Sequence, residues 1–297
     1  MSTEVWWATF EHVLTINNVI EKEKSMEIRD MRLVIASHYE AGAPKVAREI
    51  AERGVAEVFA GIPAGEVIDI RESYNAIARC AGKLLVPEDP EWPKLLNDLD
   101  VPPIALVVKG DVAVLGNQSL AIVGTRNPTP YGIRAAQEFG AGFVDREWAI
   151  VSGGAYGIDS AAHKGAIVAE GVTIAVTASG LDIPYPAGNQ RLFEEIIENG
   201  AIITEYMPGV IARPHRFLVR NRLIAALSKG TLVVEAAFRS GSLRTARDAA
   251  ELARPVMAIP GPITAPTSEG CHRLIGERSA ELVTSVADAY EFMTALA

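Results

Sequence analysis

Cysteine is scarce in this chain of 297 residues: only Cys80 and Cys271 are present, far apart and without a C-x-x-C pair. This scarcity excludes a disulfide framework and a multi-cysteine zinc site, and it fits a reducing cytoplasm. The five histidines have no H-E-x-x-H or other metal-ligand spacing, so we expect no metal and no cofactor. No apolar run approaches the ~20 residues that cross a bilayer, and the first residues lack the basic segment of a signal peptide. We therefore expect a cytoplasmic protein without a membrane partner.

Several motifs of nucleotide-binding and hydrolytic enzymes are also missing. The chain contains no G-x-G-x-x-G, no Walker A loop and no G-x-S-x-G nucleophile elbow. A dinucleotide site would further require an acid at the end of the second strand, and a glycine-rich loop stands there instead. These absences argue against a dinucleotide-dependent enzyme, a P-loop nucleotidase and an α/β-hydrolase.

Charge is distributed unevenly along the chain. The net charge is −9, yet the segment from Val210 to Arg247 carries a local +7, which leaves −16 for the remainder. Against one acid, Glu235, the segment holds eight basic residues: Arg213, Arg216, Arg220, Arg222, Lys229, Arg239, Arg244 and Arg247. Arginines on the solvated faces of two helices are the ordinary alternative, but such faces normally mix both signs. The segregation of charge therefore predicts a phosphate-binding face.

Apolar spacing predicts two parts. Residues 1–81 are expected to form a small all-helical domain, with helices at Val5–Ile20, Arg32–His38, Pro44–Arg53 and Glu72–Ala81. After a proline-rich stretch that begins near Gly82, short apolar runs alternate with amphipathic ones, which predicts an α/β domain over 82–297 with a doubly wound, mostly parallel Rossmann-like sheet. The expected strands are 104–108, 120–123, 149–152, 173–177, 202–204, 231–234 and 256–259, and the expected helices are 131–145, 158–170, 190–199, 221–228, 243–253 and 287–297.

The loops after the strands are where such a sheet binds its ligand. In the first loop Arg126 follows a strand directly, where it can hold a phosphate or form a structural ion pair with Glu205 or Glu235. In the second loop glycines let backbone N–H groups approach a phosphate; its expected contacts are Ser152, Gly153, Gly154, Tyr156 and Gly157. Asp159 and His163 on the following helix can form an acid–base pair, although an ion pair on the helix face or a capping contact is the commoner use of this spacing.

Two further stretches complete the predicted site. Arginines surround one aromatic residue in the segment Arg213, His215, Arg216, Phe217, Arg220 and Asn221, a composition that suits phosphate neutralisation and base stacking, although Phe217 can equally belong to the core. Pro214 is expected to keep the first part extended. Of Arg220 and Arg222, one is expected to anchor Glu205 or Glu235. Ser240, Gly241 and Ser242 open a helix, an anion site by its N-terminal dipole, and Arg244 lies on that helix.

Taken together, a set of segments resembles the DNA-processing protein family DprA, also called Smf. They are VGTR, SGGAYGIDSAAH, GLDIPYPAGN, ITEYMPG, PHRFLVRNRLIAALSKGTLVVEA, SGSLRTARDA, AIPGP and GCHRLI, in the same order over about residues 83–276. The resemblance implies sequence-independent binding of single-stranded DNA, a homodimer formed through the Rossmann-like domain, and loading of the RecA recombinase onto incoming DNA in natural transformation or recombination. It implies no enzymatic activity.

Residue by residue, the resemblance carries the family's V-G-[ST]-R arginine onto Arg126 and its RNR motif onto Arg220, Asn221 and Arg222. The sequence departs from the family at Ala187, where a basic residue is frequent, and no C-terminal winged-helix domain is expected. The helical N-terminal part is expected to be SAM-like. Two other classes stay open at this point: a nucleotide phosphoribohydrolase of the LOG type, whose P-G-G-x-G-T motif is missing, and a small-nucleotide sensor.

Overall fold

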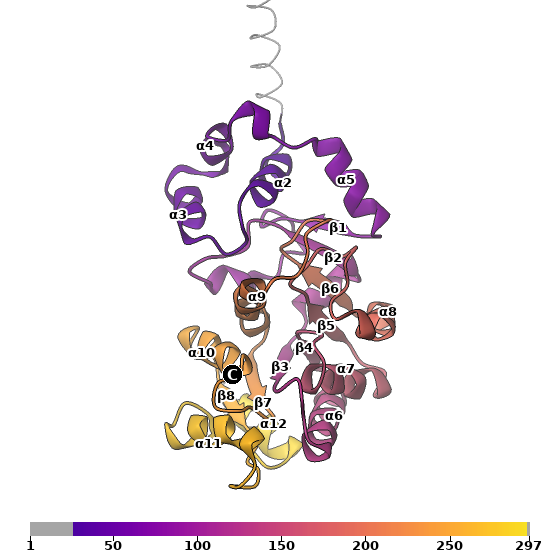
Figure 1. The fold of residues 1–297 in the computed structure, drawn as a ribbon, viewed down its shortest axis with the longest axis vertical. Helices are drawn as coiled ribbons and strands as arrows, with labels where there is room; N and C mark the ends of the chain where they lie inside the picture. The colour runs from indigo at the N-terminus through magenta and orange to yellow at the C-terminus, as the bar shows by residue number, and fades with distance from the viewer. Residues whose placement is uncertain (1–25, 296–297) are drawn as a thin grey trace, which may run out of the picture.

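The computed structural model describes residues 26–295, so the predicted helix at Val5–Ile20 lies outside the described residues. A group of four helices precedes the sheet and lies at the top of Figure 1. Their bounds are α2 Ile28–His38, α3 Pro44–Arg53, α4 Val55–Ala60 and α5 Ile70–Arg79. Of these four, the sequence analysis missed α4, a helix of 6 residues that follows Gly54 directly and is too short for a periodic pattern. It also missed α11, at Glu269–Gly276.

Nine strands form one sheet in the order β1-β2-β6-β5-β4-β3-β7-β8-β9. Their bounds are β1 Lys83–Leu85, β2 Leu106–Gly110, β3 Ser119–Val123, β4 Ala149–Ser152, β5 Thr173–Val176, β6 Ala201–Thr204, β7 Gly230–Val233, β8 Val256–Ala258 and β9 Glu281–Leu282. From β6 to β9 all neighbours are parallel, whereas β2 pairs antiparallel with β6 and β1 antiparallel with β2. The predicted α/β fold with a mostly parallel, doubly wound sheet is confirmed.

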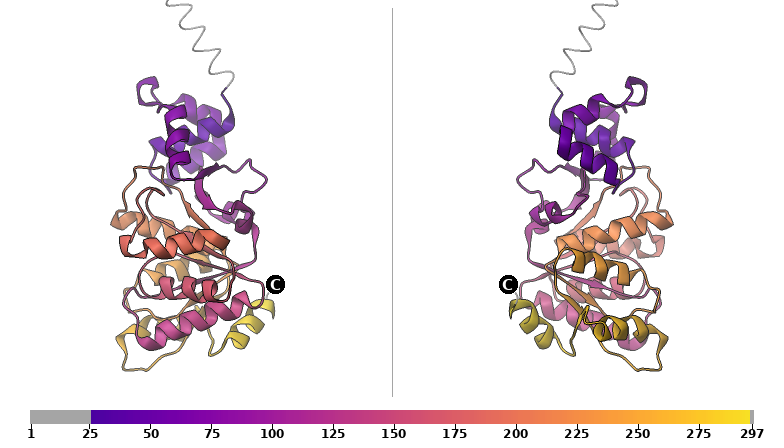
Figure 2. Two further views of the ribbon diagram at one scale, coloured as in Figure 1. Left: turned by 90° about the vertical axis from the view of Figure 1, so that its right-hand side faces the viewer. Right: turned by 90° about the vertical axis from the view of Figure 1, so that its left-hand side faces the viewer.

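Helices cover both faces of this sheet. Their bounds are α6 Pro130–Val144, α7 Ile158–Val168, α8 Gln190–Asn199, α9 Pro214–Leu227, α10 Ser242–Glu251, α11 Glu269–Gly276 and α12 Val286–Ala295. One core cluster joins α9, α10 and α11 to one face, and two others join α6, α7, α8 and α12 to the opposite face. Figure 2 shows these faces in turn, with α6, α7 and α8 toward the viewer on its left side. The strands are apolar on both sides because both faces are covered.

The start of α9 corrects one expectation. Pro214 was predicted to keep the chain extended, but it is the first residue of α9, and Arg213 is the N-cap. The first helical turn tolerates proline because its N–H would have no helical acceptor there and its φ is already helical. As a result the helix begins seven residues before the predicted start at Asn221, and Phe217 lies on the same helix as Arg220 and Asn221.

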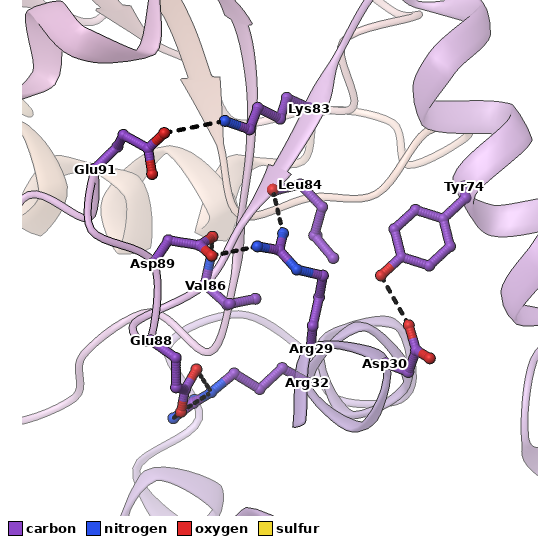
Figure 3. Close-up of polar contacts among 10 residues, drawn as sticks. All are labelled: Arg29, Asp30, Arg32, Tyr74, Lys83, Leu84, Val86, Glu88, Asp89 and Glu91. Atoms are coloured by element: carbon purple, nitrogen blue, oxygen red, sulfur yellow. Dashed lines mark hydrogen bonds and ion pairs between the residues drawn. The ribbon is translucent and has the colours of Figure 1, made fainter. Parts of the chain in front are cut away.

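The helical group is joined to the sheet through α2 and the turn after β1 (Figure 3). Arg32 forms a bidentate ion pair with Glu88, at 2.8–3.0 Å, and Arg29 pairs with Asp89 and donates to the Leu84 carbonyl. An apolar cluster crosses the same junction, formed by Leu33, Ile77, Leu84, Val86, Ala105, Val107 and Met207. The two predicted parts therefore share a core. Between residues 26 and 295, no helix combines the length and apolar character needed to cross a bilayer.

Candidate nucleic-acid interface

A crevice of about 500 Å³ opens at the carboxyl ends of β3 and β7. The chain leaves β3 toward β4 on one side and β7 toward β8 on the other, so this is the point where the strand order reverses and ligands bind in doubly wound sheets. The crevice is lined by Val123, Gly124, Arg126, Ala155, Asp159, Tyr185, Pro214, Phe217, Leu218, Arg220, Asn221, Ile224, Ser240, Gly241, Ser242 and Thr245. The four regions of the sequence that are predicted to carry the site thus meet here, three of them as loops after strands and one as the helix α9.

Two aromatic rings and an arginine form a cluster at the crevice. The guanidinium carbon of Arg126 lies 4.8 Å from the centroid of the Phe217 ring, and the ring of Tyr185 lies 5.2 Å from Phe217 on a tilt of 50°. Phe217 is partly exposed, and it belongs to none of the core clusters among the described residues. Tyr185 is 45 % exposed. A partly exposed aromatic surface beside a guanidinium is suited to stacking on a base.

Arg220 lies under the glycine-rich loop and is only 4 % exposed. Its Nη1 donates to the carbonyls of Gly153, at 2.7 Å, and Val176. A Cβ on Gly153 would overlap the guanidinium, so glycine is required there by close approach and not by its φ. Burial lowers the pKa of Arg220 to about 10, which leaves it charged at neutral pH. The side chain therefore supports the crevice wall and adds positive charge to it.

Asp159 is buried beside Arg220. Its Oδ2 accepts from the backbone N–H groups of Gly153 and Ala155, at 3.1 and 3.4 Å, so it holds the glycine-rich loop in place. Burial raises the pKa of the Asp159 carboxyl, and the nearby charge of Arg220 opposes the shift. His163 does not form an ion pair with it: its Nδ1 lies 2.7 Å from Thr173 Oγ1. Asp159 and His163 therefore do not form an acid–base pair.

The anchoring contacts are divided between two carboxylates. Arg222 Nη2 donates to both oxygens of Glu205, at 2.7 and 2.8 Å, and the pair is almost fully buried. Glu235 binds no arginine among the described residues; it accepts from the N–H and hydroxyl of Thr129, at 2.8 and 2.6 Å. The first turn of α6 is thereby fixed to β7. Arg126 forms an ion pair with neither carboxylate within residues 26–295, so its guanidinium is available to a ligand.

The N-terminus of α10 forms the opposite wall. Ser240 Oγ lies 2.8 Å from Ser242 Oγ, and the Asn221 amide donates to the Gly241 carbonyl, at 3.2 Å. A Cβ on Gly241 would meet no described atom within 4 Å, so its backbone faces open space. Arg244 does not line the crevice, and its Nε donates to Asp248 at 2.7 Å.

Other predicted contacts lie outside the crevice. Arg216 forms a bidentate pair with Glu40 of the α2–α3 turn, at 2.7 and 2.8 Å, and its guanidinium covers the ring of Tyr206. Burial of Tyr206 raises its pKa, whereas the Arg216 hydrogen bonds lower the pKa of Glu40. His215 lies 3.3 Å from Glu40, and Arg213 is exposed at the start of α9. These three residues continue the basic surface toward the helical group.

The glycine-rich loop itself contributes less side-chain surface than predicted. Ser152 is fully buried and donates to the Ile122 carbonyl, and Gly154 packs against the ring of Phe193. Gly157 has a φ of +84° and fills the bend before α7, while Tyr156 is half-exposed beyond the rim. The predicted site does not include Tyr185 or Glu40; the sequence signal for Tyr185 is its place in the segment GLDIPYPAGN. Within the described range, no cluster of three metal-ligating side chains is found.

Comparisons with known proteins identify the family of this chain. The family model described as DNA recombination-mediator protein A matches residues 83–294. A putative DNA processing protein DprA of Mycobacterium tuberculosis is 43 % identical over 241 residues, which cover 77 % of this chain and 62 % of the relative. The DNA processing protein DprA of Streptococcus pneumoniae is 42 % identical over 197 residues, which cover 66 % of this chain and 69 % of the relative. This chain thus spans somewhat less than two thirds of the length of the mycobacterial relative.

Two solved structures extend the similarity to the fold. The X-ray structure of DNA processing protein A from Streptococcus pneumoniae superposes with a TM-score of 0.78 at 32 % identity, over 90 % of this chain and 98 % of that one. The protein of the same name from Helicobacter pylori, solved in a study of its single-stranded DNA binding mode, gives a TM-score of 0.65 at 31 % identity, over 72 % and 95 %. Sequence, fold and matched segments therefore agree, and the chain belongs to the DNA recombination-mediator protein A family, the DNA-processing proteins DprA and Smf.

Proposed function

We propose that this protein binds single-stranded DNA without sequence preference and acts as a non-enzymatic mediator of recombination. The observation that supports it most directly is the cluster of Arg126, Phe217 and Tyr185 that lines the crevice. Aromatic faces stack on any base, and a guanidinium binds any phosphate, so neither group selects a sequence. The Helicobacter pylori relative was solved in a study of its single-stranded DNA binding mode, which supports single-stranded DNA as the ligand.

The proposed contacts form two groups. At the crevice, DNA touches Arg126, Phe217, Asn221 and the backbone from Ser240 to Ser242, while Arg220, Asp159 and the loop from Ser152 to Gly157 hold the wall. Along the approach, Arg213 and His215 meet the phosphates of the neighbouring nucleotides. Arg222, Glu205 and Glu235 hold the fold. Arg216 and Arg244 are already paired with carboxylates, so they contribute less than their charge suggests.

Charge pairing also sets the expected salt dependence. Arg126 and the basic segment together hold six cations without a carboxylate partner among the described residues: Arg126, Arg213, Arg220, Lys229, Arg239 and Arg247. Arg220 is buried, and Lys229 lies beside Ser119 at the other end of β3, which leaves four for the DNA. If about four phosphates are neutralised, log K should fall with log salt concentration at a slope of about −3 for a single strand. A steeper slope, as expected if all eight basic residues of the segment bound phosphate, would require the ion pairs of Arg216, Arg222 and Arg244 to open.

By the family resemblance, the proposed role includes protecting incoming single strands, forming a homodimer through the Rossmann-like domain and loading RecA during natural transformation or recombination. A nucleotide-hydrolysing enzyme is the competing class. It would need a positioned general base or metal in the crevice, and the carboxylate there, Asp159, is engaged with two backbone N–H groups.

A mobility shift with single- and double-stranded oligonucleotides of equal length, repeated over a salt series, tests the proposal. We expect preference for the single strand, equal affinity for different base compositions and the slope given above. A flat salt response, or a preference for one sequence, would refute the proposed mode of binding. Release of product from a nucleoside monophosphate would favour the enzyme.

A further inference from the structure

The crevice has a closed floor. Val123, Ile224 and Thr245 line its bottom and are each at most 3 % exposed, so a strand cannot run through it and out below. Its volume of about 500 Å³ falls within the ~300–1,000 Å³ typical of small-ligand sites. The space therefore suits roughly one nucleotide unit, whereas the rest of a strand must lie on the rim.

Charge in this closed space is unbalanced. The ionised side chains that line it are Arg126 and Arg220 against Asp159, which leaves one positive charge in excess. Arg220 is 4 % exposed, and its buried Nε has no hydrogen-bond partner among the described residues. A buried donor on a charged group is costly when unpaired, so the site favours an anionic ligand that reaches the wall.

A cradle for that anion lies on the opposite wall of the crevice. The N-terminus of α10, a helix of 10 residues, opens into the crevice at Ser240, Gly241 and Ser242. The N–H of Ser242 is held only by a long contact of 3.4 Å to Ser240 Oγ, and the Gly241 backbone faces open space. Backbone donors and the helix dipole at such a terminus bind phosphate.

From the closed floor, the excess charge, the cradle and the aromatic pair, we infer that the crevice also binds a free nucleoside monophosphate, in competition with DNA. The phosphate occupies the α10 N-terminus, and the base lies against Phe217 and Tyr185. The inference rests on the proposed function for the identity of the competing strand, but not for the nucleotide site itself. It makes occupancy of the DNA site sensitive to the pool of mononucleotides that degradation of a strand releases.

Displacement of a fluorescein-labelled oligo-dT by dTMP tests the inference, with thymidine and inorganic phosphate as matched probes at the same millimolar concentrations. We expect dTMP to displace the strand at a concentration at least tenfold below either fragment, because each fragment loses one half of the contacts. A factor of ten corresponds to ~1.4 kcal/mol, which is within what one stacked base supplies.

The diagnostic variant is Gly241→Glu. Gly241 has a φ of −62° and open space around it, so the substitution is sterically tolerated, and an acid at this end of a helix is favourable to the fold. The new carboxylate repels phosphate, so the affinity for dTMP should fall at least tenfold. Gly116→Glu is the control, because it adds the same charge away from the crevice. Gly116 is also exposed, has no described atom near its Cβ position and does not line the crevice.

The outcomes separate the two proposals. If oligo-dT binds and dTMP does not displace it, the nucleotide site is refuted and the proposed function stands. If calorimetry detects dTMP but no oligo-dT, the nucleotide site stands and DNA binding is refuted. If inorganic phosphate competes as well as dTMP, or if Gly116→Glu weakens dTMP as much as Gly241→Glu does, the base and the cradle are not the determinants and the inference is wrong.

Discussion

Replacing Phe217 with alanine isolates the contribution of base stacking to DNA binding. The ring projects from the first turn of α9, and its centroid lies 4.8 Å from the Arg126 guanidinium carbon and 5.2 Å from the centroid of the Tyr185 ring. It lies outside the core clusters of the described residues, so its removal should leave the fold intact. The substitution removes both the stacking face and the support for the guanidinium.

The expected loss follows from the contacts that disappear. One stacked base contributes ~1–3 kcal/mol, and a cation–π contact at a partly exposed site adds ~0.5–1 kcal/mol. Since the guanidinium keeps its charge and can still reach a phosphate, we expect a total of ~2–3 kcal/mol, a decrease in affinity of about 30- to 150-fold. The slope of log K against log salt should stay unchanged, because no cation is removed.

Fluorescence anisotropy of labelled oligo-dT over a salt series measures both quantities at once. Phe238→Ala provides a matched control, because Phe238 is also half-exposed and also carries an arginine, Arg273, at 4.9 Å from its ring, but it does not line the crevice. A loss below about threefold for Phe217→Ala, or an equal loss for Phe238→Ala, would refute stacking in the crevice as the source of affinity.

Three further predictions concern stability and access to the basic surface. Arg222→Ala leaves the buried Glu205 carboxylate without its partner, so the free energy of unfolding in urea should fall by ~3–5 kcal/mol; an unchanged midpoint would contradict this. Glu40→Gln releases the Arg216 guanidinium at an exposed pair, so affinity for oligo-dT should rise by up to about fivefold with less than ~1 kcal/mol change in stability, and unaltered affinity would show that Glu40 masks nothing. Burial lowers the pKa of His163 to about 3, so the folded protein resists a proton that the unfolded chain accepts below pH ~6.5; stability should therefore fall as the pH falls from ~6.5 toward 3, by up to ~1.4 kcal/mol per unit. His163→Gln should show a shallower decline in urea midpoints between pH 6 and pH 5, and an identical decline would exclude this histidine as its source.

The central strands and their helices could be predicted from the sequence because burial on both faces of the sheet requires short apolar runs for the strands and amphipathic spacing for the helices. The predicted strand at 149–152 has the bounds of β4, and the predicted helix at 190–199 has those of α8. The strands at the two edges were missed: β1 begins with exposed Lys83 at the start of the proline-rich stretch, and both residues of β9 are exposed, so neither has the fully apolar run that marks β8. Their formation depends on a neighbouring strand already in place.

Contacts across the fold were harder to predict than positions along it. Arg126 and the α10 N-terminus could be assigned to the site because both follow parallel strands and must meet at one edge of the sheet. Which arginine binds which carboxylate depends on side-chain reach: Arg222 takes Glu205, while Glu235 is bound by Thr129. Nothing local to the basic segment signals Glu40, which lies 176 residues before Arg216 in the chain.

The antiparallel pair at the start of the sheet has a consequence for shortened forms of the protein. β2 occupies the hydrogen-bonding edge of β6, and the helical group in turn covers the apolar side of β1 and β2 through Leu33 and Ile77. Cutting the chain at the predicted boundary near residue 82 would keep the edge of β6 paired but strip the cover from Leu84 and Val107. Cutting beyond β2 would bare the edge itself, which invites strand addition by another molecule. The helical group thus keeps apolar residues of the sheet away from solvent. Aggregation of a shortened chain would therefore be expected from the exposure of Leu84 and Val107.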